Sequence, residues 1–269
     1  MSNIRTNIFL GLIALTTLFL SCKPDPTPTE PKVIGSETAV KWADMTLYVV
    51  KSTVKNSPTY CSRALAYIGI TMYETVVNGS TIHQSLANQL TDMPTLPKPQ
   101  SGQTYDWVIA MNAGQASMIK KLYEHASPTV LAKVDSLAAD ILKTASTGVS
   151  KDVIDRSTTF GEAIASAIFD WSKTDGGYQG YLYNFPTDYV IPTTPGSWTV
   201  PVRGQSASRI PLHPYWGRNR NFVKQNALLF IPAMIPHSDD PQSQCYAQFL
   251  EVYSKNKILT DAEDRKSVV

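Results

Sequence analysis

Cationic side chains and a histidine lie close together in one segment of the chain. Residues 210–223 read IPLHPYWGRNRNFV and place His213, Arg218 and Arg220 among three aromatic rings. No acidic residue occurs from 189 to 238. Guanidinium groups hold tetrahedral oxyanions through paired, charge-assisted hydrogen bonds. The segment is therefore a candidate site for phosphate or a phosphate-like ion, and these three residues are the candidates to face it. The same acid-free segment also holds Arg203, Arg209 and Lys224.

The same arginines also have a structural interpretation. Cationic side chains near the end of a helix bind its last carbonyl groups, and arginines pair with carboxylates on neighbouring helices. Glu74 is such a carboxylate, because it lies in the most apolar helix of the sequence, where a charge must find a partner or change its protonation state. It is either an acid or ligand, or one half of an ion pair with an arginine. Asp44 and Arg63 leave the same two interpretations open.

Most other catalytic signatures are absent from the sequence. The four histidines are His83, His125, His213 and His237. They show neither the i,i+4 spacing nor the neighbouring carboxylate of a metal site. Residues 204–208 lack the final glycine of a hydrolase nucleophile elbow. No nucleotide-type glycine loop occurs, and Gly176-Gly177 fits a helix stop. We therefore expect no metal site and assign no catalytic residue to this chain.

The beginning of the chain resembles an export signal. Arg5 precedes an apolar run from Ile8 to Leu20, which is short for a membrane span and has the length of a signal-peptide core. The run ends at Ser21-Cys22, which resembles the cleavage site of a bacterial lipoprotein, where the cysteine receives the lipid. We predict a signal peptide over 1–21 and lipid attachment at Cys22. An uncleaved membrane anchor is the alternative.

The composition of the remaining chain narrows the choice of partners. Residues 22–35 are rich in proline and predict an extended tether that holds a domain over 36–269 off a membrane. That domain would face the periplasm or the cell surface. The net charge of +2 is far from the basic excess of a nucleic-acid binder, so we expect a membrane partner and no nucleic acid. The sequence does not fix the oligomeric state.

Two cysteines follow Cys22, at Cys61 and Cys245. Each falls at an apolar helical position, which favours two buried free thiols. A disulfide between them remains open, since export would permit it.

Apolar residues recur at helical spacing from residue 36 onward, and no alternating strand pattern of comparable length occurs. The first apolar stripe is Val40, Ala43, Leu47, Val50 and Val54. Ser57-Pro58 then starts a second helix, which is apolar on almost all sides and is expected at the centre of the fold. After a short amphipathic piece over 82–90, further helices are predicted over Trp107–Leu122, from Ser127-Pro128 to Ile141, and over Val153–Trp171. The predicted fold class is all-α, a helical bundle.

Helical spacing disappears between Thr174 and Val223, where glycine, proline and aromatic residues predominate. Segments of this length are commonly functional loops or covers over a core. A helix is expected after Pro241, with Cys245, Phe249 and Val252 on its apolar face, and another opens at Thr260. Because the final Val268-Val269 pair has no evident partner, the chain is interpreted as incomplete at its C-terminus, with a frayed terminal turn as the alternative.

Three stretches together resemble a known family. They read AVKWADMTLYVVKSTVKNSPTYCSRALAYIGITMYETVVNGS, AMNAGQASMIKKLYEH and IPLHPYWGRNRNF. In this order they resemble the amino-terminal part of bacterial vanadium-dependent haloperoxidase-like proteins of the PAP2 phosphatase superfamily, from about Ala39 to the end of the chain. The resemblance implies an α-helical bundle, vanadate as the cofactor of the complete enzyme, and either halide oxidation by peroxide or phosphate-ester hydrolysis.

The resemblance also implies which parts are missing. The family holds its oxyanion through a lysine, two arginines, a Ser-Gly-His element and a final histidine, and no Ser-Gly-His occurs in this sequence. We therefore expect this chain by itself to bind no cofactor and to be inactive in vanadate or phosphate chemistry. His213, Arg218 and Arg220 keep an accessory role toward a small anionic substrate.

The competing hypothesis is a helical surface-binding lipoprotein that captures a glycan or another nutrient. In it, Trp198, Tyr215 and Trp216 form a stacking platform and are exposed on one concave face. The enzyme hypothesis instead predicts that these rings pack onto the bundle, so the exposure of Trp216 distinguishes the two. A structural lipoprotein without a ligand is a third possibility.

Overall fold

The computed structural model describes residues 36–200, 209–223 and 233–260. Within these residues the regular elements are helices, which confirms the predicted all-α class. The segments predicted as signal peptide and tether, including Cys22, lie outside the described residues, as do Arg203, Lys224 and 261–269. Among the helices that the structure describes, none has the length and apolarity needed to cross a membrane.

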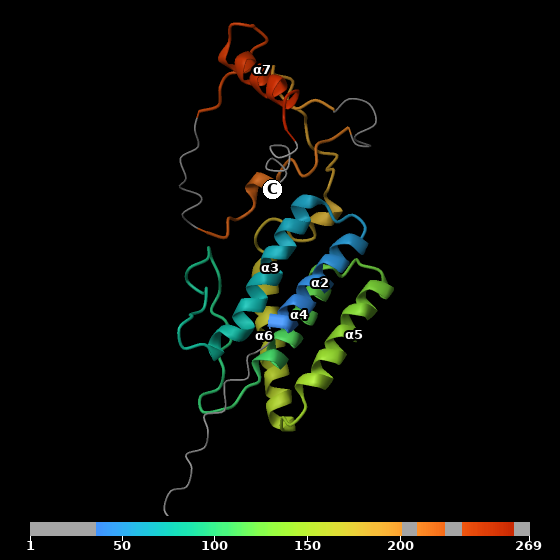
Figure 1. The fold of residues 1–269 in the computed structure, drawn as a ribbon, viewed down its shortest axis with the longest axis vertical. Coiled ribbons are helices and arrows are strands. Elements are labelled where there is room, and N and C mark those ends of the chain that lie inside the picture. The colour runs from blue at the N-terminus through green and yellow to red at the C-terminus, as the bar shows by residue number, and fades with distance from the viewer. Residues whose placement is uncertain (1–35, 201–208, 224–232, 261–269) are drawn as a thin grey trace, which may run out of the picture.

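Five helices lie side by side in an elongated bundle (Figure 1). They are α2 (Ser36–Ser52), α3 (Pro58–Val76), α4 (Trp107–Leu122), α5 (Pro128–Ala145) and α6 (Lys151–Ser172). Helix α4 contacts the other four, whereas α3, which we expected at the centre, packs mainly on α4 and α6. Residues around the whole circumference of α4 are buried, from Ile109 to Leu122. The central position therefore belongs to α4.

The helix starts follow the local sequence. The Ser57 hydroxyl accepts a hydrogen bond from the Tyr60 amide, and the Ser127 hydroxyl accepts one from the Val130 amide. In both helices the next residue is proline, which needs no hydrogen-bond partner for its nitrogen at the first turn. Asp106 caps α4 in the same way, with the amides of the next turn as donors. Both predicted Ser-Pro starts are confirmed.

The predicted apolar stripe of α2 is wrong. Val40, Leu47 and Val54 are 56%, 54% and 73% exposed, whereas α2 buries Trp42, Thr46 and Val49. The indole nitrogen of Trp42 donates to the Asn112 side chain of α4 at 3.2 Å. If α2 buried the predicted stripe, the Trp42 ring would be exposed to solvent. This would be unfavourable, because a tryptophan has more apolar area than a valine or a leucine. The ring therefore decides which side of α2 faces the core.

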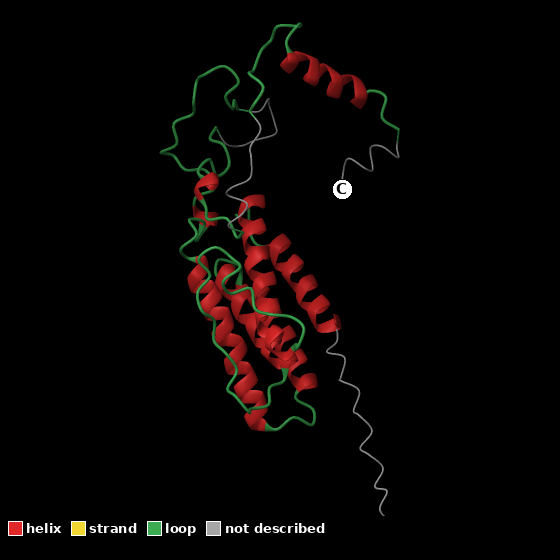
Figure 2. Cartoon of the chain, turned by 90° about the vertical axis from the view of Figure 1, so that its left-hand side faces the viewer, coloured by secondary structure: helices red, strands yellow, loops and turns green. Residues whose placement is uncertain are grey.

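Two other expected elements differ from the structure. The amphipathic piece over 82–90 forms turns rather than a helix, and Ile82 is 86% exposed. Helix α7 (Gln244–Asn256) forms after Pro241 as predicted and lies apart from the bundle (Figures 1 and 2). Its Cys245 is buried, but Phe249 and Val252 are each 69% exposed. The apolar face of α7 is thus largely open to solvent.

The prediction that Cys61 and Cys245 are free thiols is confirmed. Cys245 is buried as expected, whereas Cys61 is only half-buried at the start of α3.

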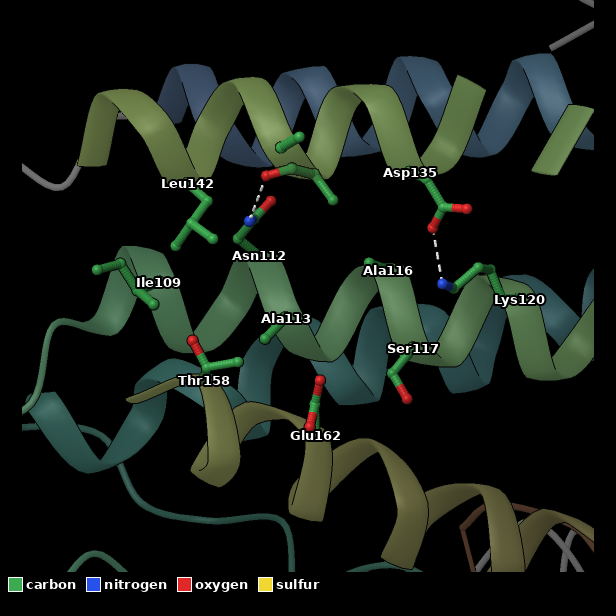
Figure 3. A pocket seen from close by; sticks show the side chains of 12 residues that line it. Ile109, Asn112, Ala113, Ala116, Ser117, Lys120, Asp135, Leu142, Thr158 and Glu162 are labelled. Atoms are coloured by element: carbon green, nitrogen blue, oxygen red, sulfur yellow. Dashed lines mark hydrogen bonds and ion pairs between the residues drawn. The ribbon is translucent and has the colours of Figure 1, made fainter. Parts of the chain in front are cut away.

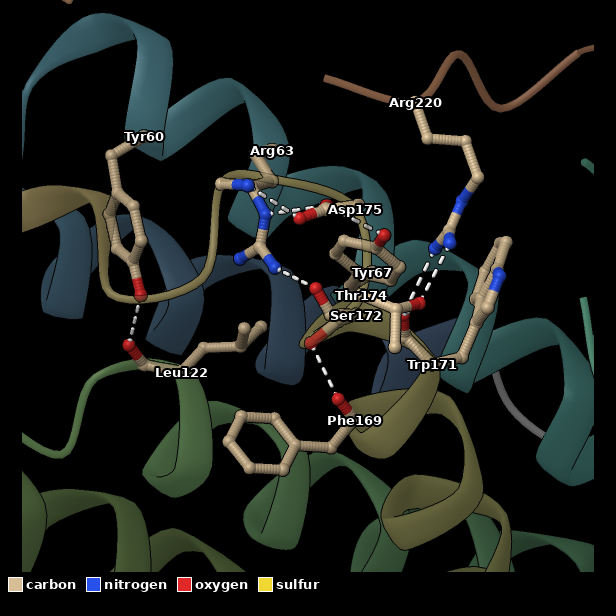
Figure 4. Close-up of polar contacts among 11 residues, drawn as sticks. Tyr60, Arg63, Tyr67, Leu122, Phe169, Trp171, Ser172, Thr174, Asp175 and Arg220 are labelled. Carbon is tan, nitrogen blue, oxygen red and sulfur yellow. Dashed lines mark hydrogen bonds and ion pairs between the residues drawn. The ribbon is translucent and has the colours of Figure 1, made fainter. Parts of the chain in front are cut away.

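A buried ion pair joins α3 to the segment that follows α6 (Figure 4). Arg63 Nε donates to Asp175 Oδ2 at 2.7 Å, and the two side chains are 4% and 5% exposed. The Tyr67 hydroxyl donates to the same oxygen at 2.8 Å, and the Gly177 amide donates to Asp175 Oδ1 at 2.7 Å. Burial, together with the Asp175 carboxylate, raises the pKa of Tyr67, so its hydroxyl keeps the proton that it donates. Both carboxylate oxygens therefore have donors, as a buried charge requires.

Two arginines cap the C-terminal end of α6. Arg63 Nη2 donates to the Ser172 carbonyl at 2.5 Å, and Arg220 Nη2 donates to the Trp171 carbonyl at 2.9 Å. Arg220 Nη1 also donates to the Thr174 hydroxyl at 2.8 Å. The last carbonyls of a helix lack partners inside the helix and carry the negative end of its dipole, so cations there are stabilising. The structural interpretation of the loop arginines is confirmed for Arg220.

We expect Asp175→Ala to lower the free energy of unfolding by about 3–5 kcal/mol, because it leaves the Arg63 guanidinium buried without its carboxylate. Urea denaturation followed by circular dichroism measures the loss. Asp135→Ala is the matched control, since Asp135 is 58% exposed and pairs with Lys120 at the surface. There we expect a loss of about 1 kcal/mol or less. Equal losses in the two variants would contradict the assignment.

We expect Gly161→Ala to destabilise the fold by about 1–3 kcal/mol, because helices α4 and α6 touch at this glycine. A Cβ added to Gly161 would lie 2.0 Å from the carbonyl oxygen of Ala110. The control is Gly69→Ala in α3, where an added Cβ meets nothing within 4 Å. That variant should be more stable than the parent by about 0.4–1 kcal/mol. Thermal unfolding of the pair checks the opposite signs.

Candidate functional site

The segment after α6 crosses the end of the bundle where α3 begins and α6 ends. It is irregular, as predicted, apart from single 3₁₀ turns at Gly180–Leu182 and Trp216–Arg218. The Arg220 amide donates to the Asp175 carbonyl at 2.9 Å, so the far end of the segment returns to α6. We call residues 173–223 the crossing loop; its residues 201–208 are outside the described part.

His213 joins the crossing loop to the start of α3 through a hydrogen bond with Thr59. The residue is buried, and its Nε2 lies 2.9 Å from the Gly180 carbonyl. Its Nδ1 contacts the hydroxyl of Thr59, and its ring stacks on Trp216 with centroids 4.7 Å apart. Burial lowers the pKa of His213. A neutral ring then donates to the Gly180 carbonyl and accepts from Thr59, which uses both nitrogens.

The two arginines of the candidate anion site point to other partners. Arg220 is bound to the end of α6, as described above. Arg218 lies over the Tyr215 ring, 4.4 Å from its centroid, and is exposed. His213, Arg218 and Arg220 therefore do not converge on one point, because they contact Gly180, Tyr215 and the end of α6, respectively. Their accessory anion-facing role stays a prediction, for which Arg218 is the most accessible member.

A pocket of about 460 Å³ lies within the crossing loop, which supplies all of its described lining residues. Its side chains include four tyrosine or tryptophan rings, one imidazole, one carboxylate and one amide: Tyr178, Tyr183, Tyr215, Trp216, His213, Asp188 and Asn219. No lysine or arginine is among the described residues that line it. The pocket therefore combines ring surface with hydrogen-bonding groups and a single negative charge. We call it the aromatic pocket.

The expected stacking platform is present only in part. Tyr215 and Trp216 both line the aromatic pocket, whereas Trp198 does not and is 38% exposed. Trp216 is half-buried and packs on His213 and near Gly180, where an added Cβ would lie 3.2 Å from the indole. Trp216 thus packs within the crossing loop and also lines a pocket, so its partial burial does not separate the two hypotheses.

The buried carboxylate of Glu74 has a partner other than the one expected. Its Oε1 accepts a hydrogen bond from the Leu86 amide at 2.6 Å, which fixes the turns after α3 to that helix. An ion pair between Glu74 and an arginine, which was one of the two interpretations, does not occur among the described ion pairs. Asp44 is exposed on α2. Neither carboxylate faces the aromatic pocket.

A second hollow of about 310 Å³ runs between α5 and α6, with α4 as its floor (Figure 3). Its cation, Lys120, is paired with Asp135 at 2.7 Å. The Asn112 amide donates to the Ala138 carbonyl at 2.9 Å, and the remaining floor is made by small side chains. The groove offers no free cation among its described lining residues. It therefore does not supply the anion site either.

Vanadate or phosphate needs several cations and an imidazole that converge on one ion. In the described residues Arg63 and Arg220 bind the end of α6, and His213 uses both ring nitrogens within the loop. No group of three or more histidine, cysteine or acidic residues that could hold a metal ion occurs in the described part of the chain. The side chains present do not fit a vanadate cradle.

The sequence reasoning missed Asp175 and most of the aromatic pocket. A signal was present in Gly176-Gly177, where Gly176 has a φ of +93° and fits the predicted helix stop. An added Cβ at either glycine would lie 2.9 Å from the Asn219 side chain. The glycine pair therefore also lets the two ends of the crossing loop meet, a contact that its spacing alone does not reveal.

Comparison with known proteins places the fold. No family model and no curated protein sequence matches the chain. Among solved structures, it is similar to a bacterial vanadium-dependent iodoperoxidase, with a TM-score of 0.67 and 25% sequence identity. The match covers 85% of this chain and 53% of the iodoperoxidase, so the chain spans about half the length of that protein. The helical bundle and its crossing loop thus have a haloperoxidase-like fold, as the sequence resemblance implied.

Proposed function

We propose that this chain is the amino-terminal helical scaffold of an exported vanadium-dependent haloperoxidase-like protein. The observation that carries the proposal is the shared fold with the iodoperoxidase over 85% of the chain. In the complete protein, bound vanadate would supply halide oxidation by peroxide. In a phosphatase-like member, a phosphate ester would occupy the same site and be hydrolysed there. The side chains of this chain build the support for such a site rather than the cradle itself.

The engaged arginines support a scaffold role. Moving Arg63 away to bind an anion would leave the buried Asp175 carboxylate without its counter-ion, and moving Arg220 would remove the arginine donor of the Trp171 carbonyl. Leaving a buried charge without its partner costs several kcal/mol. These cations are therefore structural, and the anion-binding residues of the proposed enzyme are supplied by other parts of the protein.

Exposed apolar surface on two helices also supports a scaffold role. Val40 and Leu47 on α2 are more than half exposed, and so are Phe249 and Val252 on α7. Apolar residues repeated at helical spacing are normally buried against another element. We propose that further helices of the complete protein cover these faces.

The first 35 residues complete the proposal. A signal peptide over 1–21, lipid attachment at Cys22 and a proline-rich tether over 22–35 would hold the scaffold at the outer side of a bacterial membrane. A second candidate function, the capture of a sugar-containing ligand, is favoured by the aromatic pocket.

We expect the 269-residue chain to show no saturable, stoichiometric vanadate binding in equilibrium dialysis, because its cations are engaged elsewhere. It should also leave iodide unoxidised by hydrogen peroxide beyond the background of free vanadate. The positive control is the longer protein that is encoded when the reading frame is extended past Val269. This should carry a lysine, Arg-Pro, Ser-Gly-His and a final histidine, and should bind vanadate. Tight vanadate capture by the 269-residue chain, or a frame without these residues, would contradict the proposal.

We expect bacteria that express the chain with its own N-terminus to attach labelled palmitate to it, and expect the protein to fractionate with membranes. Cys22→Ala should abolish the labelling, because the proposed acceptor is the Cys22 thiol. Cys61→Ala is the matched control and should keep it. Labelling that survives Cys22→Ala, or the absence of labelling in the parent protein, would rule out lipid attachment at Cys22.

A further inference from the structure

We propose that the aromatic pocket is a binding site for a neutral sugar ring, formed by Tyr183, Tyr215, Trp216, Asp188 and Asn219. This inference goes beyond the scaffold role, because it uses none of the vanadate chemistry. The volume of the pocket, its ring surfaces, its hydrogen-bonding groups and its charge support this assignment.

The ring surfaces suit the apolar side of a sugar. A pyranose has faces made of C–H bonds and an edge made of hydroxyl groups, so it can remove apolar area from water against an aromatic ring. Trp216 is held in place by the His213 ring, at 4.7 Å and an interplanar angle of 15°. Tyr215 is held by the edge of Tyr189, with centroids 5.4 Å apart. Rings fixed in this way lose little freedom when a ligand binds.

The polar groups suit the hydroxyl edge. The carboxylate of Asp188 accepts a long hydrogen bond of 3.4 Å from the Tyr215 hydroxyl. Because a carboxylate can accept about four hydrogen bonds, Asp188 keeps capacity for the hydroxyls of a ligand. The Asn219 amide supplies both a donor and an acceptor at the lining of the same pocket. A few fixed polar groups among rings are the usual composition of a specific small-molecule site.

The charge of the pocket argues against an anion. Asp188 is the charged residue among its described lining residues, and Arg218 lies over the Tyr215 ring instead of lining the pocket. A pocket whose lining holds a carboxylate and no lysine or arginine disfavours phosphate and vanadate. The accessory anion role predicted for this loop therefore does not extend to the aromatic pocket.

The size of the pocket argues against a small cation. Rings and a carboxylate also attract alkylammonium groups. However, the volume of about 460 Å³ lies within the range of pockets that enclose whole organic ligands, and a single trimethylammonium group would fill little of it. One or two sugar rings fill the volume and use the amide as well as the rings.

The test is a titration of the full chain, monitored by tryptophan fluorescence and calorimetry, with a fixed set of probes. The neutral probes are maltose, cellobiose and the disaccharide of N-acetylglucosamine; choline is the cation, and inorganic phosphate is the anion. We expect saturable binding of at least one neutral saccharide, and no saturable binding of choline or phosphate. Binding of choline or phosphate without any saccharide would overturn the proposal, and so would the absence of binding by all five probes.

Variants locate the binding in the pocket. Tyr183→Ala should weaken saccharide binding by about tenfold or more, because Tyr183 lines the pocket. Tyr183 is 61% exposed, so its removal should leave the fold intact. Tyr253→Ala on α7, where the ring is 59% exposed outside the pocket, is the matched control and should bind as the parent does. Trp216→Ala should abolish binding, but it also removes the ring stacked on His213. Equal affinity of the parent and Tyr183→Ala would overturn the assignment. This outcome is independent of the vanadate assay, which has a different ligand and readout.

Discussion

The buried ion pair between Arg63 and Asp175 fixes the relation between the bundle and the crossing loop. Taking two charges out of water costs several kcal/mol each, and this cost is offset only when their hydrogen-bonding groups find partners. Asp175 accepts from Arg63, Tyr67 and Gly177, and its own carbonyl accepts from the Arg220 amide. Helix α3 and both ends of the crossing loop therefore meet at one residue, Asp175, just after the end of α6. Gly176 and Asn219, which line the aromatic pocket, are the sequence neighbours of Asp175 and Arg220 at this junction.

The same junction explains why a basic, acid-poor segment is not a phosphate cradle. A positive charge is needed at the end of α6, where the Trp171 and Ser172 carbonyls have no partners within the helix. Arg220 meets this need from the loop and Arg63 meets it from α3. The pocket within the loop is lined by four tyrosine or tryptophan rings, the His213 imidazole and one carboxylate, so its charged group has the opposite sign to the arginines in the sequence around it. Local charge in a sequence is thus a poor guide to the charge of the pocket that it builds.

Local signals in the sequence predicted local structure well. The Ser57-Pro58 and Ser127-Pro128 starts were correct because a cap involves only the residues of one turn. The face of α2 was wrong because an apolar stripe does not record that Trp42 has a partner in Asn112, far along the chain. The Arg63–Asp175 pair was missed for the same reason, since its members lie 112 positions apart. The bundle could be predicted from helical spacing, but the site depends on contacts between distant segments that spacing does not encode.

The position of His213 makes the attachment of the loop sensitive to acidity. Its neutral ring accepts a hydrogen bond from Thr59 while it donates to the Gly180 carbonyl, and protonation would remove the accepting nitrogen. Burial lowers the pKa of His213 below its ordinary value of about 6.5. As the pH falls, His213 in a detached loop therefore becomes protonated at a higher pH than His213 in the attached loop. The attachment is then at full strength above that pH and weakens as the surroundings become more acidic. The crossing loop is therefore held less firmly to the start of α3 in acid than at neutral pH.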